Sequence, residues 1–189
     1  TSNQTPVFTW NPVAGTGITY EIQISTTTTF TLPVAQTAAG LGTPTYTATT
    51  LPNGLYYWRV RAVNSDPLVG PFSAYRSFTV DINPPLAPAL SSPADNAKVI
   101  STPTFTWLAS AGANKYQFQL AQDNLFTVSV YTPAIQTTLS RIPSPALPPG
   151  TYYWHVQAGD AAGNWSPWSV VRKLTILPAP VLTAPANAL

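Results

Sequence analysis

The chain has 189 residues, enough for one large domain or two smaller ones, and 44% of them are hydrophobic, which excludes a chain that is disordered throughout. Only 7% of the residues are charged and the net charge is +2, so we expect no nucleic-acid partner. The absence of Cys excludes disulfides and thiolate metal sites. Because no apolar run reaches the roughly 18 residues that span a bilayer, we expect no membrane insertion.

Segments in which apolar and polar residues alternate occur along the first half of the chain. They cover residues 8–10, 20–24 and 56–62, and an Asn-Gly turn signal at 53–54 precedes the last of them. A period of two is typical of half-buried β-strands, and no stretch shows the sustained 3.6-residue period of an amphipathic helix. We therefore predict an all-β structure.

The second half of the chain repeats the first. The segment LPNGLYYWRVRA, which begins at Leu51, returns as LPPGTYYWHVQA, which begins at Leu147, an offset of 96 positions. Nearer the start, TPVFTW at 5–10 matches TPTFTW at 102–107 with an offset of 97. Self-similarity of this kind indicates repeated structural units, so we predict two tandem domains and a tail. Their bounds are 1–81, 82–177 and 178–189.

The repeated segment has a recognisable order of residues: a Leu, a Pro-Gly-type turn, a Tyr and then an alternating Val-x-Ala strand. This order resembles the corner between strands E and F of fibronectin type III domains, whose corner tyrosine would be Tyr56 and Tyr152. The core tryptophan of that family's strand B would be Trp10 and Trp107. The resemblance implies two tandem immunoglobulin-like β-sandwiches. The expected core residues are Trp10, Tyr56, Trp58, Trp107, Tyr152 and Trp154.

Side chains with catalytic potential are few. The only histidine, His155, matches Arg59 of the first repeat on the outward side of its strand, so we predict that both side chains, and that of Arg61, are solvated. The acidic residues are scattered along the chain, and there is no phosphate-binding Gly-rich loop and no His cluster with metal-ligand spacing. We predict that the chain is not an enzyme and holds no cofactor or metal.

The stretch after the last long strand combines a turn with two tryptophans. Residues 160–164 form a turn rather than a Ca²⁺ loop, because their acidic density is low. The following WSPWS at 165–169 is similar to the Trp-Ser-x-Trp-Ser box of cytokine-receptor fibronectin domains. That family interleaves its tryptophans with strand F arginines, whereas this strand offers His155 and Gln157, so we expect a structural role. Two sequons make Asn3 and Asn164 candidate glycan attachment sites.

The two repeats differ at their beginnings. Residues 84–97 (PPLAPALSSPADNA) precede the second repeat and are expected to carry its first strand, whereas the first repeat has no such lead. A cognate segment, PAPVLTAPANAL, follows the second repeat at 178–189. A sandwich without its first strand exposes core side chains and an unpaired sheet edge, which favours strand addition. The residues expected to insert from the tail are Val181, Leu182 and Pro185.

Joining the tail of one copy to the head of the next keeps the repeat in register. Ten positions separate Pro93 from Pro103, and ten also lead from Pro185 through the junction to Pro6. Three readings stay open at this point. The chain is one period of a longer tandem polypeptide, or separate subunits exchange their tails, or the ends of the chain carry no structural meaning.

From these features we predict a non-catalytic structural protein that is extracellular or on the cell surface. Low charge, abundant Thr and the lack of oxidisable sulfur favour that location. Its copies would join head to tail into a fibre, stalk or surface filament, with donor-strand complementation as one means of joining. The alternative is an adhesive or carbohydrate-binding accessory module of a larger surface protein or secreted enzyme. In that case Tyr57, Tyr153 and Trp165 would stack on surface glycans.

Overall fold

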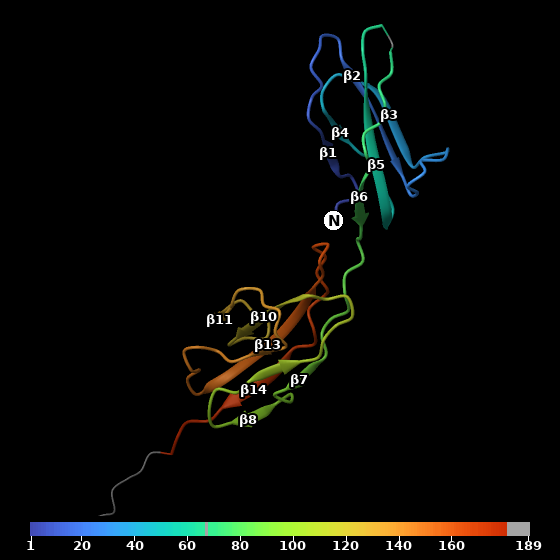
Figure 1. Cartoon of the computed structure of the whole chain (residues 1–189). Coiled ribbons are helices and arrows are strands. Elements are labelled where there is room, and N and C mark those ends of the chain that lie inside the picture. Colours follow the sequence, from blue (N-terminus) through green and yellow to red (C-terminus); the bar gives the residue numbers. More distant parts are fainter. Residues whose placement is uncertain (67, 181–189) are drawn as a thin grey trace, which may run out of the picture. The chain divides into compact units, whose positions relative to one another are not determined.

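The computed structural model describes residues 1–66 and 68–180 and divides into two compact units (Figure 1). Unit 1 is Thr1–Asn83, and unit 2 begins at Pro84. The described residues form strands and connecting loops without a helix, so the predicted all-β fold is confirmed. No helix long and apolar enough to cross a membrane occurs among those residues.

Unit 1 is a sandwich of two antiparallel sheets (Figure 1). One sheet has two strands, β1 (Val7–Thr9) and β4 (Thr45–Thr47). The other has four strands, which in spatial order are β3 (Gln36–Leu41), β2 (Thr19–Ser25), β5 (Gly54–Val63) and β6 (Arg76–Val80). Alternate side chains of both sheets meet between the layers. The buried core residues there are Phe8, Ile22, Ile24, Ala48, Leu51, Tyr56 and Val80.

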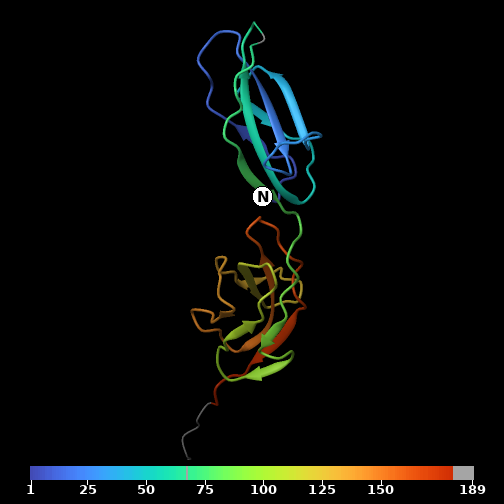
Figure 2. The same ribbon diagram turned by 45° about the vertical axis from the view of Figure 1, so that its right-hand side comes forward.

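Unit 2 repeats this arrangement with one more strand in each sheet. Figure 2 shows the same ribbon from a second direction. The first sheet has the order β12 (Ser140–Arg141), β9 (Phe105–Trp107), β7 (Leu90–Ser92). The second has the order β11 (Ser129–Tyr131), β10 (Lys115–Ala121), β13 (Gly150–Gly159), β14 (Arg172–Ile176), β8 (Ala97–Val99). The additional strands are β7, which pairs with β9, and β8, which runs parallel to β14.

The expected core residues differ in burial between the units. Trp107 is 2% exposed in unit 2, and Tyr152 and Trp154 are fully buried. In unit 1 Tyr56 is buried, but Trp10 and Trp58 are only half-buried and pack against the margin of the core. The sequence prediction placed both tryptophans fully inside. They are more exposed because no strand of the described chain covers the side of unit 1 that corresponds to β7.

The corner tyrosines close the turn before the longest strand of each unit. The hydroxyl of Tyr56 donates to the carbonyl of Pro52 at 3.0 Å, and that of Tyr152 donates to the carbonyl of Pro148 at 2.8 Å. Burial raises the pKa of Tyr152, so this hydroxyl keeps its proton at neutral pH. The same bond, four residues back along the chain, holds the corner in both units.

We expect Tyr152→Phe to lower the free energy of unfolding of unit 2 by about 1 kcal/mol, the typical contribution of one hydrogen bond. The ring stays in place, so the change removes the hydrogen bonds of the hydroxyl, which are the one to the Pro148 carbonyl and a side-chain contact with Gln122. Denaturant unfolding followed by circular dichroism measures the change. Tyr153→Phe, on the opposite face of the strand, is the control. Equal effects of the two substitutions would contradict a role for the corner bond.

Candidate strand-acceptor groove

Unit 1 has two adjoining pockets on its open side. The first has a volume of about 350 Å³ and the second about 540 Å³. Trp10, Asn11, Val60 and Ser73 line both, so the two pockets form one continuous groove, called here the acceptor groove. It extends from Arg76 in the first pocket to the second pocket, whose lining is mostly apolar.

Unpaired strand edges border the acceptor groove. Among the described residues, β1 pairs only with β4, and β6 is the last strand of its sheet. The far end of β6 is partly paired, because Thr1 donates from its amino group to the Thr79 carbonyl at 2.8 Å and accepts from the Asp81 amide at 2.9 Å. In unit 2 the corresponding edges carry β7 and β8.

At the open side of unit 1, residues are more exposed than their equivalents in unit 2. Val156 is fully buried, whereas its counterpart Val60 in the groove is half-buried. Ser169 is 8% exposed, whereas its counterpart Ser73 is an exposed residue. Both serines accept a hydrogen bond from the backbone amide of that neighbouring valine, at 3.1 Å in unit 2 and 3.2 Å in unit 1. The walls are therefore built alike, and they differ in what covers them.

In unit 2 the segment that contains β7 covers this side. Leu90 pairs with Trp107, and the Leu108 amide donates to the Ala89 carbonyl at 2.9 Å. The residues before Ala89 therefore continue past Leu108, in the direction that leads from Asn11 to the second pocket in unit 1. Four side chains of the segment are buried, and three of them are prolines. They are Pro85, Pro88, Leu90 and Pro93.

One arginine of unit 2 holds the backbone of the β7 segment. The guanidinium of Arg172, the first residue of β14, donates to the Leu90 carbonyl at 2.7 Å, to the Ser91 carbonyl at 2.9 Å and to the Pro93 carbonyl at 2.8 Å. A guanidinium presents several N–H donors in a fixed plane, which suits a turn of backbone with carbonyls that converge. Arg172 thereby fixes the point at which β7 ends.

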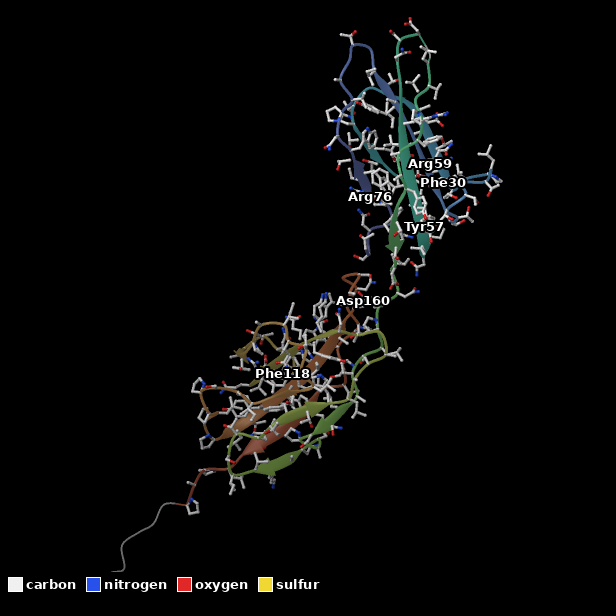
Figure 3. All side chains as sticks on the ribbon, in the orientation of Figure 1. Phe30, Tyr57, Arg59, Arg76, Phe118 and Asp160 are labelled. Carbon is white, nitrogen blue, oxygen red and sulfur yellow. The ribbon has the colours of Figure 1, made fainter. Side chains whose placement is uncertain are left out.

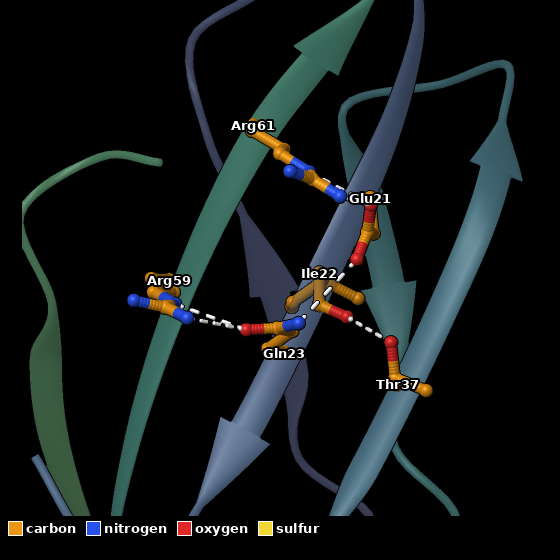
Figure 4. A network of polar contacts seen from close by, with 6 residues as sticks. All are labelled: Glu21, Ile22, Gln23, Thr37, Arg59 and Arg61. Carbon is orange, nitrogen blue, oxygen red and sulfur yellow. Dashed lines mark hydrogen bonds and ion pairs between the residues drawn. The ribbon is translucent and has the colours of Figure 1, made fainter. Parts of the chain in front are cut away.

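On the outer face of the larger sheet in unit 1, polar side chains of neighbouring strands form hydrogen bonds with one another (Figure 4). Arg61 donates to Glu21 at 2.5 Å and Arg59 donates to Gln23 at 2.8 Å, between β5 and β2. Arg59 also lies between the rings of Phe30 and Phe72, at 4.1 and 4.0 Å from their centroids. Both arginines therefore lie on the outer face, as predicted, but they are half-buried rather than freely solvated, because loop aromatics pack on them.

The prediction that His155 is exposed was also wrong. This side chain is 7% exposed, because Phe126 and Trp168 stack on its two faces with ring centroids at 3.6 and 3.9 Å. Its Nε2 shares a hydrogen bond with Gln119 at 2.9 Å. Burial lowers the pKa of His155 to about 4. The ring is therefore neutral at physiological pH and is part of the packing.

The WSPWS segment docks on β13 through its serines. Ser166 and Ser169 accept hydrogen bonds from the backbone amides of Ala158 and Val156, at 2.9 and 3.1 Å. The Trp165 ring lies under the ammonium group of Lys115, 5.4 Å from the ring centroid. That contact covers one face of the ring and reduces its use as a platform for sugars. In unit 1 Tyr57 likewise packs edge-on against Tyr75.

The remaining candidate residues lie apart from the groove. Asn3 is exposed, whereas Asn164 is half-buried and its amide donates to the Asp160 carboxylate at 2.8 Å. The carboxylate of Asp160, which Figure 3 labels, also accepts from the Gly163 amide, so its oxygens hydrogen-bond within the turn. The described part of the chain holds no cluster of acidic or His side chains that fits a metal ion. The expected donor residues lie outside the described residues. They are Val181, Leu182 and Pro185.

Comparison with known proteins identifies the fold. No family model and no curated protein matches the chain. The FN1–FN3 domains of chicken CNTN1 superpose with a TM-score of 0.57 at 18% identity over 93% of this chain, which spans 64% of the length of that structure. The fibronectin(III)-like modules of Clostridium thermocellum CbhA superpose with a TM-score of 0.51 at 15% identity over 94% of this chain and 88% of theirs. The chain therefore consists of two tandem units with the fibronectin type III fold.

Proposed function

We propose that the chain is a non-catalytic structural module whose copies join head to tail, by insertion of a β7-like strand into the acceptor groove of unit 1. The observation that supports this most directly is the groove itself, which lies where β7 completes unit 2. Two unpaired edges and half-buried tryptophans at one site favour a strand as the missing partner, because a strand supplies both ladder hydrogen bonds and apolar side chains.

The tail of another copy has the composition of such a strand. Residues 180–185 (PVLTAP) match residues 88–93 (PALSSP) at Pro, Leu and Pro, the three positions that are buried in unit 2. Burial of a leucine side chain such as that of Leu182 contributes about 1.5–3 kcal/mol. A groove on one end and a donor strand on the other make a heterologous contact that does not close, so repeated joining produces a filament.

Two polypeptide arrangements satisfy this proposal. The inserted strand belongs to the tail of a separate subunit, or it precedes unit 1 in one longer chain of repeated modules. Both arrangements give a linear series of sandwiches, and they differ only in the covalent link. A neutral, hydroxyl-rich surface without oxidisable sulfur suits an extracellular or cell-surface fibre, stalk or filament. Glycan binding by a module of a larger secreted protein is the less supported alternative, because the candidate aromatics Trp165 and Tyr57 already contact neighbouring side chains.

Substitution in the tail tests the proposal. We expect the purified chain to associate with rising concentration into end-to-end assemblies that are visible by electron microscopy. Leu182→Arg should abolish the association, because a guanidinium would enter the apolar part of the groove. Val181→Arg is the matched control. The sequence pattern placed Val181 among the inserting residues, but its counterpart Ala89 is exposed in unit 2, so the proposal places this side chain toward solvent. Sedimentation velocity measures all three proteins. A chain that stays monomeric at high concentration and binds no added tail peptide would overturn the proposal.

A further inference from the structure

A charged side chain stands at the point where the acceptor groove meets β6. Arg76, the first residue of β6, lines the first pocket and is exposed (Figure 3). It is the cross-strand partner of Trp58, so both side chains lie on the inner face of the sheet. Within the described residues its guanidinium makes no hydrogen bond and no ion pair. An exposed guanidinium beside the acceptor groove, with no hydrogen-bond partner among the described residues, is available to a ligand that accepts hydrogen bonds.

Unit 2 supplies the template for that ligand. Arg172 is the equivalent of Arg76, 96 positions later, and is likewise the cross-strand partner of the equivalent tryptophan, Trp154. Its guanidinium is bound by the three carbonyls of Leu90, Ser91 and Pro93. The remaining walls of the two sites correspond as well, since the valine and serine pairs described above match. The ligand of Arg76 is therefore expected to be a strand backbone that turns at a proline.

We propose that Arg76 is the residue of unit 1 that selects the inserted strand, and that it binds the carbonyls of Leu182, Thr183 and Pro185 of a second copy. This inference rests on the proposed function, and it adds the register in which the tail strand inserts into the groove. In the template Pro88, Leu90 and Pro93 are buried while Ala89 is exposed. The tail therefore inserts Pro180, Leu182 and Pro185, and Val181 faces solvent.

The chemistry of the tail favours this contact over an ion pair. Residues 177–189 contain no charged side chain, so backbone carbonyls are the acceptors they offer to a guanidinium. The inserted prolines, Pro180 and Pro185, lack amide donors and cannot extend the ladder at their positions, which leaves the inserted segment with fewer backbone bonds to β1. Hydrogen bonds from a charged donor are stronger than neutral ones and compensate for that deficit. The spacing of the prolines and the leucine supplies the selectivity.

A binding measurement with the free tail peptide tests the role of Arg76. The acceptor is the full chain with Leu182→Arg, so that its own tail does not compete, and the probe is a fluorescent peptide of residues 177–189. An acceptor that carries Arg76→Gln as well as Leu182→Arg should bind the peptide about tenfold more weakly or worse, since the hydrogen bonds that it loses come from a charged donor. Arg76→Lys should recover only part of the loss, because an ammonium lacks the planar fork. Lys98→Gln, which changes the net charge equally on unit 2, should leave binding unchanged.

The outcomes separate the inference from the proposed function. Equal binding to the acceptors with and without Arg76→Gln would overturn the role of the arginine and leave strand insertion standing. An equal loss in Arg76→Gln and Lys98→Gln would also overturn it, as a general charge effect. If the peptide binds neither the Leu182→Arg acceptor nor the acceptor that also carries Arg76→Gln, the proposed function itself is overturned. Without peptide, the melting temperatures of the acceptors should agree, because Arg76 makes no hydrogen bond in the described chain.

Discussion

Replacement of Trp154 by Ala will lower the free energy of unfolding of unit 2 by about 3–5 kcal/mol, the usual cost of emptying a buried aromatic site. The indole is fully buried and packs against Phe105 and Phe118, with ring centroids at 5.1 and 6.1 Å. It belongs to the same buried cluster as Phe105 of β9 and Leu90 of β7, so the neighbouring structure has little room to collapse into the cavity. Guanidinium unfolding, fitted with a separate transition for each unit, measures the loss.

The same substitution at Trp58 provides a matched control, because this residue is the equivalent of Trp154 in unit 1. Its ring is half-buried beside the acceptor groove, so Trp58→Ala should cost clearly less, about 1–2 kcal/mol, in proportion to the smaller area removed from water. When the tail peptide saturates the acceptor groove, the loss of stability caused by Trp58→Ala should rise toward the loss caused by Trp154→Ala. If the two tryptophans cost the same without peptide, the groove is not open in solution.

Acidification from pH 7 to pH 4 will destabilise unit 2 by up to about 3 kcal/mol, with unit 1 as the internal reference. Burial lowers the pKa of His155 from 6.5 to about 4 in the folded state. The unfolded chain therefore binds a proton near pH 6.5, whereas the folded unit does not. Stability from this group is complete above pH 6.5 and is lost as the pH falls toward 4. Attraction between an imidazolium and the stacked rings of Phe126 and Trp168 offsets part of the loss.

The histidine can be observed directly, because it is the only one in the chain. Titration of its ring protons by NMR gives the pKa in the folded state, and thermal unfolding between pH 4 and pH 7 gives the change in stability. His155→Gln should flatten the dependence for unit 2. A ring that titrates near 6.5 in the folded protein would contradict the stacked arrangement.

Much of the fold followed from local patterns. The period of two, the turn signals and the repeat of residues 51–62 at 147–158 predicted the sandwiches, and the corner tyrosines Tyr56 and Tyr152 lie where the family resemblance implies. Such features depend on neighbours within a few residues along the chain, which a sequence displays. The expectation that unit 1 has no counterpart of β7 rested on the same comparison of repeats.

Contacts between distant segments were less accessible to prediction. His155 resembled an exposed strand residue, because the rings that cover it come from the loops at Phe126 and Trp168. No local sequence pattern distinguishes Arg76. Its proposed role depends on the three carbonyls that bind the equivalent Arg172, which come from a segment about 80 positions away in the chain.

The sequence by itself determined the class of fold and its repetition in two units, because hydrophobic period and internal repetition are properties of the linear chain. The tertiary structure alone decided which side chains are covered and where the acceptor groove lies. Burial depends on what packs from elsewhere in the chain, so Trp58 and Trp154, which share the sequence Tyr-Tyr-Trp, have different surroundings. That difference accompanies β7, which is present in unit 2 and has no counterpart in the described part of unit 1, and it is the basis of the proposed joining of modules.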